Sequence, residues 1–158
     1  MTTSSQDLDR RIAEIGKSLG LEFNYDRVLV TPNTLAGHRL LWWTSERGGQ
    51  DALADKLFHA YFSEGRDIGN LEVLAQVAGE VGLAIAEARC FLESDTGRDE
   101  VLREEAEGRR RGLNAVPFFL LNRTAAFSGA QPPEVFAAAF RELLAADGSS
   151  SDADCRSP

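Results

Sequence analysis

Cysteine is scarce in this chain of 158 residues, which contains Cys90 and Cys155 and no Cys-x-x-C motif. Two cysteines so far apart provide neither a disulfide framework nor the ligand spacing of a metal site. A count this low fits a reducing compartment. We therefore expect a cytoplasmic protein without a bound metal, and leave open a disulfide between Cys90 and Cys155.

Long apolar runs and excess positive charge are also lacking. No uninterrupted apolar stretch approaches the ~18 residues of a membrane span, and Met1–Asp7 has no leader pattern. Lys and Arg total 17 against 25 Asp and Glu, for a net charge of −8. This balance argues against membrane and nucleic-acid partners. The glycines form no phosphate-binding fingerprint, so we expect no cofactor.

The first two thirds of the chain carry helical patterns. Leu8, Ile12, Ile15 and Leu19 recur at steps of four, three and four, which predicts a helix that ends near Gly20. The charged segment 97–111 predicts a surface helix that ends in Arg109–Arg111. Further helices are predicted after 32–34, from 50, after 70 and over 85–92.

Strand patterns appear only afterwards. Val116–Leu121 and Ala125–Ser128, joined through 122–124, predict a β-hairpin. The apolar face of Val135–Leu144 predicts a last helix that covers this hairpin. The Ser- and Asp-rich residues 147–158 predict a disordered tail.

Pro117 is unusual near the head of an apolar run of strand length, because proline has no N–H to give to a sheet. One interpretation is a proline that only begins an edge strand. The other is a cis Val116–Pro117 bond whose exposed backbone pairs with an extended substrate.

Four segments of the chain, in this order, resemble the DsbA family, and specifically its FrnE-like branch. Together they span most of residues 10–144. They are Gly20–Asn24 continuing through Pro32–Thr34 to His38–Leu40, then Tyr61–Ile68, Ala115–Phe119 and Ser128–Pro132.

The resemblance implies an α/β fold, in which a partial thioredoxin-like part made of the hairpin and last helix carries a large all-α insertion. It implies one domain over 1–146, with the insertion at about 5–111 and the thioredoxin part at about 112–146. It also favours the cis form of Val116–Pro117.

The family's substrate groove would include Val116 and Pro117, with Asn33 and His38 lining it from the insertion. For His38 the plainer alternative is a hydrogen-bonded structural residue, because no nucleophile is evidently arranged with it.

Relatives in this family are thiol–disulfide oxidoreductases or isomerases that begin with a strand and a Cys-x-x-C or Ser-x-x-C motif. Nothing in this chain matches that part, so we expect no catalytic residue and no redox activity as it stands. Met1 is the sole methionine, and a misassigned start or a split gene would explain the missing part.

The candidate partners are a peptide or small-molecule thiol or disulfide substrate, a second copy of the chain, and a complementing N-terminal segment. Self-association is expected because the strand from Val116 lacks its usual neighbour and leaves an apolar edge. A non-catalytic binding or scaffold module is the alternative function.

Cys90 lies between Arg89 and Phe91 in a helical pattern. Free cysteines usually behave as small buried hydrophobic residues, and this is our interpretation of Cys90. A lone reactive thiol is the alternative.

Overall fold

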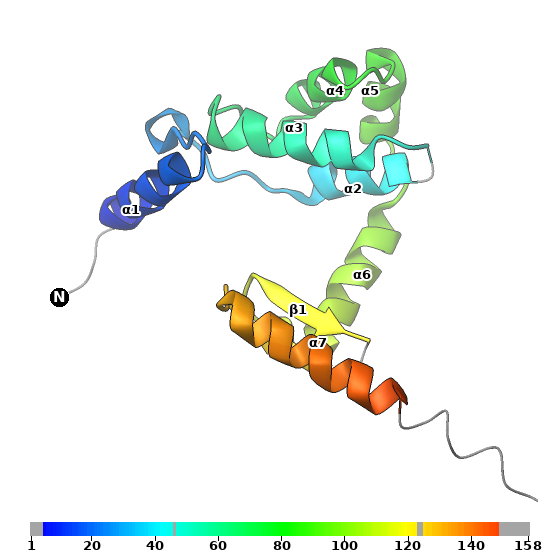
Figure 1. The fold of residues 1–158 in the computed structure, drawn as a ribbon. Coiled ribbons are helices and arrows are strands. Elements are labelled where there is room, and N and C mark those ends of the chain that lie inside the picture. The colour runs from blue at the N-terminus through cyan, green and yellow to red at the C-terminus, as the bar shows by residue number, and fades with distance from the viewer. Residues whose placement is uncertain (1–4, 46, 123–124, 149–158) are drawn as a thin grey trace, which may run out of the picture. The chain divides into compact units, whose positions relative to one another are not determined.

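The structure, a computed structural model, describes residues 5–45, 47–122 and 125–148. They form two compact units, residues 1–104 and 105–158. The first unit is all helical, and the second contains a hairpin (Figure 1). The elements are α1 (Ser5–Ser18), η1 (Tyr25–Arg27), α2 (Leu35–Ser45), α3 (Gln50–Phe62), α4 (Leu71–Glu80), α5 (Ile85–Glu93), α6 (Arg98–Arg110), β1 (Phe118–Leu121), β2 (Ala125–Ser128) and α7 (Pro133–Gly148).

The core of the first unit lies among α2, α3, α4 and α5, which pack against one another in pairs. Leu40, Leu53, Leu74 and Val77 are fully buried there. Leucine and valine at these positions follow the helical spacing of the sequence, so burial of one face holds each helix.

Helix starts in this unit follow the sequence closely. The side chain of Asn70 accepts hydrogen bonds from the N–H groups of Glu72 and Val73, which caps α4. Asn33 Oδ1 accepts from the Leu35 N–H at 3.0 Å, at the start of α2. The predicted helices at 50, 70 and 85 are therefore confirmed.

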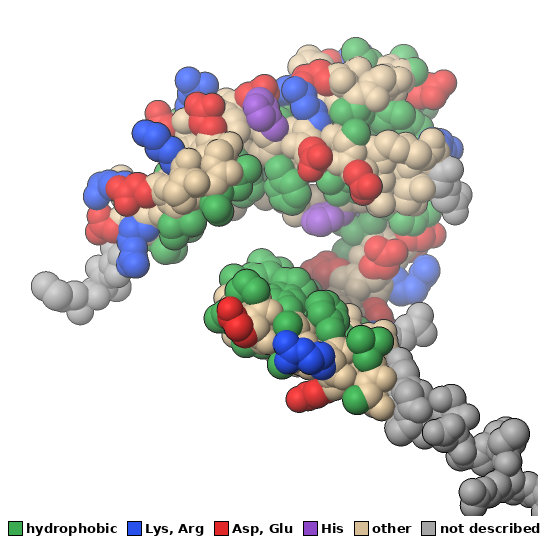
Figure 2. All heavy atoms as spheres, viewed as in Figure 1, with side chains coloured by type: hydrophobic (Ala, Val, Ile, Leu, Met, Phe, Trp, Pro, Cys, Tyr) green, Lys and Arg blue, Asp and Glu red, His purple; other side chains and the backbone are tan. Residues whose placement is uncertain are grey.

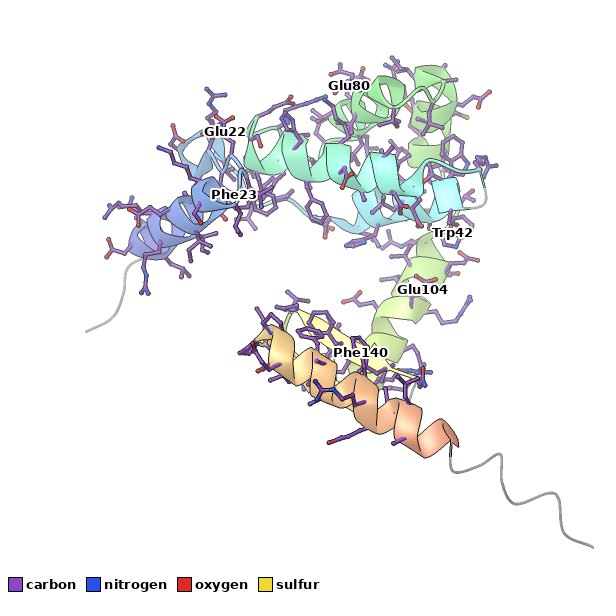
Figure 3. All side chains as sticks on the ribbon, viewed as in Figure 1. Glu22, Phe23, Trp42, Glu80, Glu104 and Phe140 are labelled. Atoms are coloured by element: carbon purple, nitrogen blue, oxygen red, sulfur yellow. The ribbon has the colours of Figure 1, made fainter. Side chains whose placement is uncertain are left out.

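Helix α1 carries the predicted stripe, but the stripe faces solvent. Ile15 and Leu19 are 61% and 71% exposed. Phe23, just after the helix, meets Phe62 of α3 edge to face at 5.3 Å (Figure 3). The aromatic contact thus joins the segment after α1 to α3.

In the second unit β1 and β2 form a two-stranded antiparallel sheet, with Phe119 opposite Phe127. Phe136 of α7 meets both rings edge to face, at 4.8 and 5.0 Å between centroids. The predicted hairpin and the helix that covers it are confirmed.

Two boundaries differ from the sequence prediction. The strand begins at Phe118 rather than Val116, because Pro117 cannot donate to a ladder. Helix α7 continues through Gly148, so the tail expected from 147 does not begin there. Residues 149–158, including Cys155, lie outside the described residues. Within the described residues, no helix is long and apolar enough to cross a membrane.

The expectation that Cys90 is a buried hydrophobe is wrong. Its thiol is free and the residue is exposed. On α5 the buried positions are Ala88, Phe91 and Leu92, and Cys90 falls between them on the solvent face of the helix. Counting from the buried residues at helical spacing would have placed it there.

Candidate functional site

The predicted site residues fall into two pairs on different compact units. Val116 and Pro117 lie together directly before β1, in the second unit. Asn33 and His38 lie at the start of α2, in the first unit. Each pair is described by its own surroundings.

The peptide bond between Val116 and Pro117 is cis. The Pro117 carbonyl accepts a hydrogen bond from the Gly129 N–H at 2.8 Å, which continues the hairpin ladder by one position. The side chain of Val116 is 82% exposed. An apolar side chain is therefore presented to solvent beside a backbone that the hairpin holds in place.

The free edge of the hairpin begins at this point. Hydrogen bonds in an antiparallel ladder alternate between the two edges of a strand. Since Pro117 and Phe119 face β2, the backbone groups of Val116, Phe118 and Leu120 turn to the other edge. No strand covers that edge in the part of the chain that the structure describes. Such an edge can accept an extended peptide as a further strand.

Exposed apolar side chains occur on the same compact unit as this edge. Leu120 of β1 is 37% exposed, and on α7 Phe140 and Leu144 are 49% and 72% exposed. Figure 2 shows apolar side chains gathered on the surface of this unit. Exposed apolar area of this kind marks a contact surface.

His38 lines a pocket of about 300 Å³ between α2 and α3. It is exposed, and its imidazole has no hydrogen-bond partner among the described residues. Asn33 is not part of the lining, and its Oδ1 atom is engaged with Leu35. The pocket is lined by Thr31, Pro32, Thr34, Gly37, His38, Leu41, Ala54, Leu57, Phe58, Tyr61, Phe62 and Ile68.

The sequence did not indicate the α3 wall of this pocket. Phe58 follows the apolar spacing of its helix, yet it is 64% exposed. Only its position beside α2 shows that it borders a pocket. No pattern in the sequence carried that signal.

Metal and redox groups are not evident in the geometry. The described residues contain no group of three or more His, Cys, Asp or Glu side chains placed to hold a metal ion. Cys90 is the one cysteine in the described part of the chain. It is not among the residues that line the α2–α3 pocket. Within the described residues, the arrangement provides no pair of thiols for disulfide exchange.

A hairpin preceded by a cis proline and covered by one helix, in a chain that also contains an all-helical unit, is consistent with the class of thioredoxin-like proteins with a helical insertion. The model of the DsbA-like thioredoxin domain matches residues 1–141, and the chain belongs to this family.

Two relatives are consistent with that assignment. The crystal structure of a probable DsbA oxidoreductase from Streptomyces coelicolor superimposes with a TM-score of 0.77 at 30% identity, over 97% of this chain and 62% of that one. The protein YwbO of Bacillus subtilis is 29% identical over 128 residues, 79% of this chain and 62% of the relative. The chain therefore spans somewhat less than two thirds of the length of these relatives.

Proposed function

We propose that this chain supplies the substrate-binding part of a thiol–disulfide oxidoreductase or isomerase of the FrnE-like branch. Its role would be to hold a peptide or small disulfide substrate, while redox-active cysteines come from residues that this sequence does not contain. The observation that carries the proposal is the open edge at Val116, next to the cis Pro117 and without a covering strand among the described residues.

Substrate binding and disulfide exchange would be carried out by different parts of the protein. The outward backbone groups of Val116 and Phe118 would pair with an extended substrate, which places a disulfide beside the edge. Attack on that disulfide requires a thiolate with a resolving thiol nearby. Cys90 is exposed but has no second thiol near it in the described residues, so it does not meet that requirement.

The experiment is a chimera with the Streptomyces coelicolor protein. Residues 1–141 of this chain replace their counterpart, and the relative keeps its front segment, where members of the family carry the Cys-x-x-C motif. We expect the chimera to reduce insulin disulfides, with the unaltered relative as the positive control. The 158-residue chain alone should show no reduction above the background of the reductant.

Variants within the chimera test the edge itself. Val116→Asp should lower the rate of insulin reduction about tenfold, because a carboxylate would be desolvated where the substrate docks. Ala138→Asp adds the same charge at an exposed position of α7 and should leave the rate unchanged. Equal rates for the two variants would refute the role of Val116. Reduction by the isolated chain with both cysteines replaced would refute the proposal as a whole.

A non-catalytic binding module is the second candidate function. The lack of any Cys-x-x-C motif in the chain favours it. A chimera that folds and binds peptide at Val116, yet never reduces insulin although the unaltered relative does, would select this alternative.

We also propose that the protein resides in the cytoplasm. The free, exposed thiol of Cys90 supports this, because such thiols persist in reducing compartments. Protein taken from its native cells into iodoacetamide without reductant should carry a label on Cys90. A Cys90 that is already oxidised or disulfide-bonded would contradict the proposal.

A further inference from the structure

The pocket between α2 and α3 has an unusual lining for a protein with a net charge of −8, because it contains no Lys, Arg, Asp or Glu. A charged ligand would lose hydration in such a site without finding a partner, so a neutral ligand is favoured. The neighbouring hollow over α3 differs, since Glu22 and Asp55 contribute to its lining. The lack of charge distinguishes the α2–α3 pocket from this neighbour.

Most polar groups of the pocket come from one side, which also contributes the apolar Pro32 and Leu41. Thr31, Thr34 and His38 belong to the segment before α2 and to its first turns. The facing helix α3 contributes Ala54, Leu57, Phe58 and Phe62, with the hydroxyl of Tyr61 as its one polar group. A ligand that fits would have an apolar ring system on one side and a hydrogen-bonding group on the other.

The size of the pocket limits the ligand further. A volume of about 300 Å³ holds on the order of ten water molecules at about 30 Å³ each. This accommodates an aromatic compound of two or three rings. Phe58 and Phe62, whose rings lie 6.3 Å apart and nearly parallel, offer aromatic surface to such a ring.

We propose that the α2–α3 pocket binds a neutral aromatic small molecule with a single hydrogen-bonding group, such as a hydroxyl or carbonyl. The proposal rests on the proposed role of His38 in lining a substrate groove, and it names the class of compound that the groove takes. Charged ligands, such as carboxylate-bearing thiols or peptides, should bind this pocket more weakly than neutral ones. Binding involves no covalent step.

The test uses two fluorescent probes with the same ring system, applied to the full 158-residue chain. N-phenyl-1-naphthylamine is neutral, and 8-anilinonaphthalene-1-sulfonate adds a sulfonate. We expect saturable binding of the neutral probe at one site per chain. The sulfonate should bind this site at least about tenfold more weakly, because its charge finds no partner there.

A matched pair of variants tests whether the neutral probe binds in the pocket. Ala54 lines the pocket from α3, while Ala52 lies exposed on the same helix and outside the lining. Ala54→Phe should fill the pocket and weaken binding of the neutral probe at least about tenfold, and Ala52→Phe should not change it. This pair also controls for adsorption to the exposed stripe of α1.

A second variant covers the case in which Ala54→Phe fails to fold. Phe58 is largely exposed, so Phe58→Ala should keep the far-ultraviolet circular dichroism spectrum and weaken the neutral probe several-fold. Equal binding to wild type, Ala54→Phe and Phe58→Ala would overturn the proposal, as would sulfonate binding as tight as that of the neutral probe. The probes need no redox partner, so a failure here leaves the insulin result for Val116 unaffected.

Discussion

Arg39 is a buried cation that carbonyl groups surround. Its guanidinium donates hydrogen bonds to the backbone carbonyls of Phe91, Leu92, Ser94 and Thr96, and it lies 5.2 Å from the centre of the Phe91 ring. These carbonyls lie at and just beyond the end of α5, where the helix dipole is negative. Arg39 therefore fastens α2 to the end of α5.

We expect Arg39→Met to lower the free energy of unfolding by about 3 kcal/mol, since it leaves several buried carbonyls without donors. The measurement is urea denaturation followed by circular dichroism. Arg47→Met is the matched control, because Arg47 also bonds a helix-end carbonyl, that of Trp43 at 2.8 Å, but is exposed. A similar loss in both variants would mean that burial is not what makes Arg39 important.

At the scale of elements, Glu80 ties α4 to α3 and to the loop after α3. Its carboxylate lies 2.9 Å from Lys56 Nζ and 2.7 Å from an Arg66 guanidinium nitrogen. The hydrogen bond from Lys56, followed by that from Arg66, lowers the pKa of Glu80 below its ordinary value of 4.5. Figure 3 labels Glu80 on α4.

The lowered pKa of Glu80 determines how its contribution to stability changes with pH. A carboxyl whose pKa is lowered on folding stabilises the fold above its unfolded pKa, and this contribution is lost as the pH falls below about 4.5. Glu80→Gln should therefore reduce stability at pH 7 and flatten its decline in acid. Because the side chain is 36% exposed, solvent screens the pair and the effect should stay within about 1 kcal/mol.

Urea denaturation at pH 7 and at pH 3.5 measures this difference. Glu107→Gln provides the control, because Glu107 also has a lowered pKa but pairs with Arg110 of its own helix and with Arg111, the next residue along the chain. If the free energy of unfolding fell more steeply in acid for Glu80→Gln than for wild type, the stabilising role assigned to the Glu80 carboxylate would be contradicted.

The second unit depends on one aromatic cluster. Phe119 and Phe127 stack across the two strands at 5.3 Å, and Phe136 closes the cluster from α7. A two-stranded sheet is marginal unless another element covers it, so this helix is what maintains the hairpin.

Phe136→Ala should lower the stability of the hairpin by about 2 kcal/mol, less than for a fully buried ring because Phe136 is only half-buried. Amide hydrogen exchange at β1 and β2 measures the loss. Phe140→Ala, on the same helix and 49% exposed, should change exchange little. Unchanged exchange in Phe136→Ala would show that something else holds the hairpin.

The sequence predicted features correctly where a single helix or hairpin accounts for the pattern of residues. The cap at Asn70 and the hairpin are local, and both appear in the structure, with Phe118–Leu121 paired to Ala125–Ser128. It failed for Cys90, where burial depends on which face of α5 meets its neighbours. It could not show the wall that Phe58 gives to the α2–α3 pocket, because α2 and α3 come together only through tertiary packing.

At the scale of the whole molecule, apolar surface remains uncovered on both units. Leu19, directly after α1, and Leu144 on α7 are each more than 70% exposed, and the edge of β1 is open within the described residues. Relatives are longer than this chain. By the family resemblance, their front segment would supply the strand next to β1. We propose that a partner covers these surfaces.

For the isolated chain we predict concentration-dependent self-association, because an open apolar edge is favourable for pairing with a second copy. Sedimentation velocity over a hundredfold range of concentration measures it. Val116→Asp should shift the chain toward monomer, and Ala138→Asp should not. A monomer at every concentration that also melts cooperatively would contradict this prediction.

The most direct test of the central claim is to map peptide binding on the isolated chain. An extended, uncharged peptide from the insulin B chain would be titrated into ¹⁵N-labelled protein while the amide chemical shifts are followed. Our account predicts saturable shifts at Val116, Phe118 and Leu120, and their loss in Val116→Asp. Shifts confined to other elements, or none at all, would show that the edge before β1 is not the substrate-binding surface.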